Sequence, residues 1–78
     1  MSQEQFTAIL PYISAALVSM IVSKKSISEE NAILKLYTST LYAALEQEDT
    51  KLWQYSTQML YSLLEQEERT GAIRYPDV

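Results

Sequence analysis

Two acidic clusters contain most of the side chains in this sequence that could do acid–base or metal chemistry. They hold six of the ten Asp and Glu residues: Glu46, Glu48, Asp49, Glu65, Glu67 and Glu68. Histidine and cysteine do not occur, so the commonest general base, the commonest transition-metal ligand and the thiolate nucleophile are all missing. What remains is a carboxylate pair or an oxygen-ligated Mg²⁺ or Ca²⁺ site.

The expected positions of the two clusters argue against catalysis. Each cluster falls in the last turns of a predicted helix, where the helix dipole disfavours further negative charge. In an antiparallel helix pair these ends point to opposite poles, so one chain cannot bring both clusters to one metal. A single glycine cannot build a phosphate-binding loop. We therefore expect no enzyme activity, cofactor or metal site in one chain. We interpret the clusters as a solvated acidic rim, and the alternative is an acidic patch that binds a partner.

The spacing of apolar residues predicts an all-α fold. Apolar side chains recur every three or four residues through most of the chain, which is the period of a helix with one buried face. We expect a single domain over residues 1–78, with three main helices at about 3–23, 29–47 and 52–70. A break near 38–40 is an alternative, because Thr38-Ser39-Thr40 forms helix poorly. The residues after Gly71 are expected to form a short extended tail.

Several residues are typical helix caps. Ser2 with Gln5 and Ser26 with Glu29 fit the capping-box pattern. Ser39 is a further candidate if the second helix breaks there. The third helix has alternative N-caps at Asp49, Thr50 and Ser56, and Gly71 suits its C-terminal end.

The first helix has more apolar surface than a chain of this length is expected to bury. Ala8 to Val22 is apolar around almost its whole circumference. Pro11 is expected to cause a kink or an irregular first turn. The outward side, together with half-polar aromatic residues elsewhere, predicts a homodimer interface. Its candidate residues are Ala8, Tyr12, Ala15, Val18, Val22, Tyr42, Trp53 and Tyr61.

Charge and hydropathy argue against nucleic acid and a membrane as partners. The six basic residues are scattered and the formal net charge is -4, so we expect no nucleic-acid binding. The apolar run Phe6 to Val22 is seventeen residues long, short of the roughly twenty that a spanning helix needs. A membrane span is therefore not expected. The first residues lack a targeting pattern, which favours the cytoplasm.

The chain also contains an internal similarity. The segment Leu41 to Asp49 aligns with Leu60 to Glu68, and six of the nine positions are identical. A separation of nineteen residues is too short for the common solenoid repeats. We interpret the two segments as two helix C-termini that pack in the same way.

Three motifs occur in the last two-thirds of the chain: Leu36-Tyr37-x-Ser39, Leu45-Glu46-x-Glu48-Asp49-Thr50-Lys51-Leu52-Trp53 and Glu68-x-Thr70-Gly71. With these motifs, this part of the chain resembles a family of small, uncharacterised helical bacterial proteins of Gram-positive type. The resemblance implies a small cytosolic helical protein, sometimes encoded beside toxin-like or regulatory neighbours. It supplies no catalytic residue, and residues 1–25 carry no matching motif.

These observations favour a non-enzymatic interaction protein that self-associates through its N-terminal helix. One alternative is an acidic antitoxin-like or regulatory protein whose exposed helix is covered by a different protein. Another is a carboxylate metal site that two copies form together, in which case the six clustered carboxylates would be the ligands.

Overall fold

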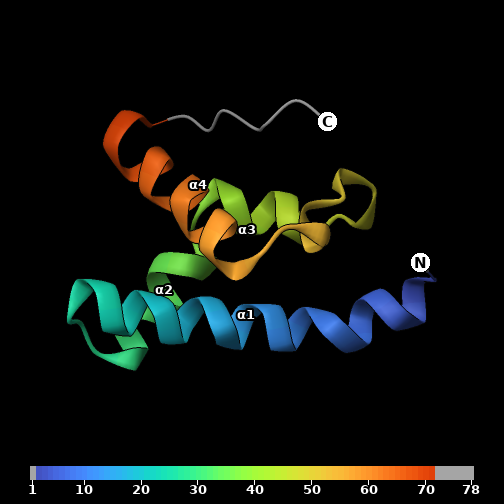
Figure 1. Ribbon diagram of the computed structural model, residues 1–78, viewed down its shortest axis with the longest axis horizontal. Coiled ribbons are helices and arrows are strands. Elements are labelled where there is room, and N and C mark those ends of the chain that lie inside the picture. The colour runs from blue at the N-terminus through green and yellow to red at the C-terminus, as the bar shows by residue number, and fades with distance from the viewer. Residues whose placement is uncertain (1, 72–78) are drawn as a thin grey trace.

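The computed structural model describes residues 2–71 and places four α-helices in them (Figure 1). The helices are α1 (Gln3–Lys25), α2 (Glu29–Tyr37), α3 (Thr40–Leu45) and α4 (Thr57–Thr70); the 3-10 helices η1 (Glu48–Thr50) and η2 (Leu52–Gln54) join α3 to α4. This part of the chain has no strand, so the all-α prediction is confirmed. The extended tail predicted for the C-terminal end lies outside the described residues.

The second predicted helix is divided into α2 and α3, as the alternative at 38–40 allowed. The Thr38 hydroxyl donates to the Leu34 carbonyl oxygen at 2.7 Å, and the Ser39 hydroxyl donates to that of Leu36. Ser39 then caps α3, because its Oγ accepts from the Tyr42 amide at 3.0 Å. Serine and threonine hydroxyls therefore satisfy the backbone groups that the break exposes.

The capping predictions for α1 and α2 have different outcomes. Ser2 and Gln5 form the expected capping box, with two bonds of 3.2 Å. The prediction that Ser26 caps the second helix is wrong. α1 continues through Lys25, and Ser26 ends it in the left-handed conformation with φ 55°. The cap of α2 is Ser28, whose Oγ accepts from the Asn31 amide at 3.1 Å.

α4 begins later than expected and ends where expected. Its N-cap is Ser56, which accepts from the Met59 amide at 3.1 Å, and the residues from 52 to 54 form η2. Gly71 ends α4 with φ 75°, a conformation that glycine adopts without strain. α1 runs through Pro11 as one continuous helix.

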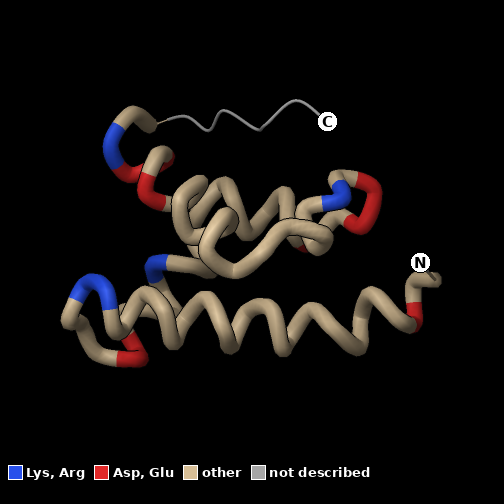
Figure 2. Tube along the Cα trace, viewed as in Figure 1, with Lys and Arg blue, Asp and Glu red and all other residues tan. Residues whose placement is uncertain are grey.

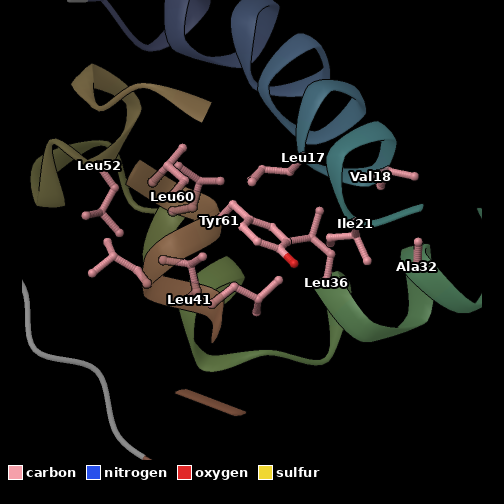
Figure 3. Close-up of a cluster of buried hydrophobic side chains, with 12 residues drawn as sticks. Leu17, Val18, Ile21, Ala32, Leu36, Leu41, Leu52, Leu60 and Tyr61 are labelled. Atoms are coloured by element: carbon pink, nitrogen blue, oxygen red, sulfur yellow. The ribbon is translucent and has the colours of Figure 1, made fainter. Parts of the chain in front are cut away.

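The core lies where the inner side of α1 meets the shorter helices (Figure 3). Leu17 and Ile21 of α1 are fully buried there, and Tyr61 of α4 reaches into the same cluster. The other main core side chains come from α2, α3, η2 and α4: Ala32, Leu36, Leu41, Leu45, Leu52, Leu60, Leu63 and Leu64. α1 therefore lies along one side of the molecule with only its inner side packed (Figure 1).

Candidate functional site

The carboxylates of the second acidic cluster contact other helices of the same chain. Glu67 extends from α4 to the start of α3, where its two carboxylate oxygens accept from the amides of Thr40 at 2.8 Å and Leu41 at 3.0 Å. These amides belong to the first turn of α3 and have no partner within their own helix. A negative charge at a helix N-terminus is also favourable. Glu67 therefore joins α4 to α3.

Glu65 and Glu68 form ion pairs that connect three helices. The Lys35 Nζ of α2 lies 2.6 Å from one carboxylate oxygen of Glu68, and the Lys25 Nζ of α1 lies 3.4 Å from the other. Lys25 is also 3.7 Å from Glu65. Hydrogen bonding to Lys35 holds the pKa of Glu68 below its usual value, and hydrogen bonding to Glu68 raises the pKa of Lys25.

The lowered pKa of Glu68 predicts a loss of stability in acid. A carboxylate with a lower pKa in the folded chain stabilises the fold above its unfolded pKa, and this contribution disappears as the pH falls through its folded pKa. We expect the urea midpoint to fall between about pH 5 and about pH 3. Glu68→Gln should show a smaller fall over that range. An identical pH dependence of both proteins would show that the Glu68 pairs do not contribute.

The first acidic cluster lies away from these pairs (Figure 2). Glu46 follows α3 as its C-cap residue, and Glu48 and Asp49 are in η1. Glu48 lies 3.7 Å from the Lys51 ammonium within the same loop. Among residues 2–71 no three carboxylates come together as a metal site. The carboxylates of the second cluster thus contact other helices, whereas most carboxylates of the first cluster lie at the surface.

Three aromatic residues expected at an interface are engaged within the chain. Tyr61 is buried in the core. Tyr42 stacks on Tyr37 with ring centroids 4.5 Å apart. The indole N–H of Trp53 donates to the Glu48 carbonyl oxygen at 3.0 Å and so closes the loop between α3 and α4. All three therefore have contacts within their own chain.

The outward side of α1 remains open. Ala8, Tyr12, Ala15 and Ser19 are exposed and Val22 is half-buried; we call these five residues the α1 outer face. Tyr12 is 78% exposed. The prediction that Val18 belongs to this side is wrong, because Val18 is only 8% exposed and is part of the core cluster.

A groove of about 440 Å³ runs along the border between the α1 outer face and α2. Its walls include Ser14, Ala15, Val18 and Val22 of α1 and Ile33 and Tyr37 of α2. The sequence did not reveal this groove, since a helical period shows which residues share a face but not where a second helix crosses it.

Ser14 is the unusual residue of this groove. It is 4% exposed, and its Oγ has no hydrogen-bond partner among the described residues. Burial raises the pKa of Tyr42, and the nearby Ser14 hydroxyl opposes this with a smaller effect. The Ser14 Oγ nevertheless lacks a hydrogen bond of good geometry to any described residue. A buried unpaired polar group costs about 1–3 kcal/mol. Residues 2–71 thus leave a polar group beside the groove without a hydrogen-bond partner.

Comparisons with protein-family models, with curated proteins and with solved structures return no match to this chain. The resemblance to small bacterial helical proteins therefore stays a prediction.

Proposed function

We propose that this protein is a non-enzymatic interaction protein that self-associates through the α1 outer face. The observation that carries the proposal is the poor coverage of α1, since only 28% of its most apolar 18-residue stretch is buried. No charged side chain occurs between Glu4 and Lys24, so most of the length of α1 carries no charge (Figure 2). An apolar, uncharged helix face is typical of a protein contact surface.

α1 is also long and apolar enough to cross a membrane, judged by length and composition alone. A membrane position conflicts with its inner side, where Phe6, Leu17 and Ile21 are at most 2% exposed. A helix surrounded by lipid would lose the packing of Leu17 and Ile21 in the core that α1 shares with α2 and α4. We therefore favour a protein partner, and a second copy is the simplest one because the same surface is present on it.

Sedimentation velocity across a micromolar concentration range tests the proposal. We expect the native chain to sediment with twice its 8.9 kDa mass. Ala15→Asp should sediment as a monomer with unchanged circular dichroism, because Ala15 is exposed and the new carboxylate would be buried only in the dimer.

Ala43→Asp is the matched control, because it places the same charge on an exposed alanine of α3. It should leave the dimer intact. A native chain that stays monomeric at every concentration would reject self-association, and the antitoxin-like alternative would then take its place.

A further inference from the structure

The surface around α1 combines a protruding ring with a groove. Tyr12 protrudes from the α1 outer face, and the groove between α1 and α2 lies beside the same face. The outer face follows steps of four and three residues from Ala8 to Val22, the spacing that keeps one seam along a pair of packed helices. Alanine and serine in that seam let a second helix come close. A surface with both a protrusion and a groove can be complementary to itself under two-fold symmetry.

The area of α1 alone is too small for a stable dimer. A helix of 23 residues is about 35 Å long and about 10 Å wide, so its face covers about 350 Å². A stable complex needs about 800 Å² from each partner. The contact must therefore extend past α1, and across the groove the next element is α2 with Ile33 and Tyr37. A second copy that lies in the groove contacts both helices and roughly doubles the area.

The direction of the second copy follows from the ends of α1. In a parallel pair the helix N-termini lie together, which places Glu4 beside Glu4 of the second copy and sets dipole ends of equal sign side by side. In an antiparallel pair the positive N-terminal end of each helix lies beside the negative C-terminal end of the other. Charge complementarity thus favours the antiparallel direction.

The polar groups of the groove suggest the register. With the two-fold axis at Ala15, the middle residue of the outer face, the partner's Tyr12 lies opposite Val18. Helical side chains lean toward their own N-terminus, so this ring would lean toward Val22 and bring its hydroxyl to the Glu29 carboxylate, which also lines the groove. The partner's Ser19 would lie opposite Pro11, which is exposed and also lines the groove.

We propose that two copies pair α1 with α1 in antiparallel direction about Ala15, each placing its Tyr12 in the groove between α1 and α2 of the other. This inference rests on the proposed self-association and specifies its partner, direction and register. The dimer would then contain a central layer of two α1 helices flanked by the two α2 helices.

Cysteine cross-linking tests the register, because the chain has no cysteine of its own. Under mild oxidation Ala15→Cys should give a disulfide-linked dimer, since the two-fold axis brings both sulfur atoms within bonding distance. Ala8→Cys should not cross-link to itself but should form a mixed disulfide with Val22→Cys. Ser62→Cys, exposed on α4, is the control and should stay monomeric on a non-reducing gel.

The outcomes separate this inference from the proposed function. If sedimentation shows a dimer but Ala8→Cys cross-links to itself, the helices are parallel and the register is overturned. The register is also overturned by a dimer in which Ala15→Cys does not cross-link. A native chain that sediments as a monomer overturns the self-association itself.

Tyr12 variants test the role of the groove by sedimentation equilibrium. Tyr12→Ala should raise the dissociation constant at least about tenfold, because it removes the ring that fills the groove. Tyr12→Phe keeps the ring and loses the bond to Glu29, so we expect a rise of about three- to tenfold. Leu34→Ala is the control, because Leu34 is exposed on α2 and does not line the groove. Equal dissociation constants for Tyr12→Ala and the native chain would overturn the placement of the ring.

Discussion

Leu17→Asp is expected to leave the chain unfolded. Leu17 is 0% exposed and packs in the cluster that α1 shares with the three other helices. A carboxylate at this position would be buried without a counter-charge, because Lys25 and Lys35 are already paired with Glu68. The expected loss is more than about 4 kcal/mol. A small domain has little more stability than this in total.

Far-ultraviolet circular dichroism with urea denaturation measures this effect. Leu34→Asp is the matched control, because Leu34 is 58% exposed on α2 and the same substitution there buries no charge. The control should keep its helix content and its cooperative transition. If Leu17→Asp also kept both, α1 would not be part of the core.

Glu67→Ala should have the second largest effect. It removes the two hydrogen bonds that α3 receives from α4. Hydrogen bonds to a charged group contribute about 1.5–3 kcal/mol each; both are partly exposed to water, so we expect a total loss of about 2–3 kcal/mol. α3 has only six residues and is too short to persist without such contacts.

The thermal midpoint is the suitable measurement, and it should fall by about 10–20 °C for a domain of this size. Glu65→Ala removes a carboxylate from the same helix, and within residues 2–71 its one ion pair is the 3.7 Å contact with Lys25, so its midpoint should change little. Glu67→Gln keeps one accepting oxygen and should lie between the two. Equal midpoints for Glu67→Ala and Glu65→Ala would show that the α3 contact contributes nothing.

The two similar segments show how far a local pattern determines structure. In the first segment the helix ends at Leu45, and the Thr50 hydroxyl donates to the carbonyl oxygens of Ala44 and Gln47 at 3.0 and 2.8 Å. In the second segment the helix continues to Thr70. There the acidic residues are bonded to α1, α2 and α3. The expectation that both segments end helices alike fails because their neighbours differ.

In residues 2–71, three of the four α-helix N-caps were among those that the sequence predicted. Ser2, Ser39 and Ser56 all cap helices that the pattern had allowed. The choice between Ser26 and Ser28 was not predictable in this way. It depended on α1 continuing through Lys25, where the lysine pairs with Glu65 and Glu68 far along the chain.

The sequence by itself determined that this protein is all-α, that Ser2, Ser39 and Ser56 can cap helices, and that α1 is apolar on more than one side. Those properties depend on neighbours within about one helical turn. Only the tertiary structure decided that Val18 and Tyr61 lie inside, that Glu67 binds the start of α3, and that Ser14 lines a groove. Each of these depends on where a distant helix crosses, and that position is set by the packing of the whole core.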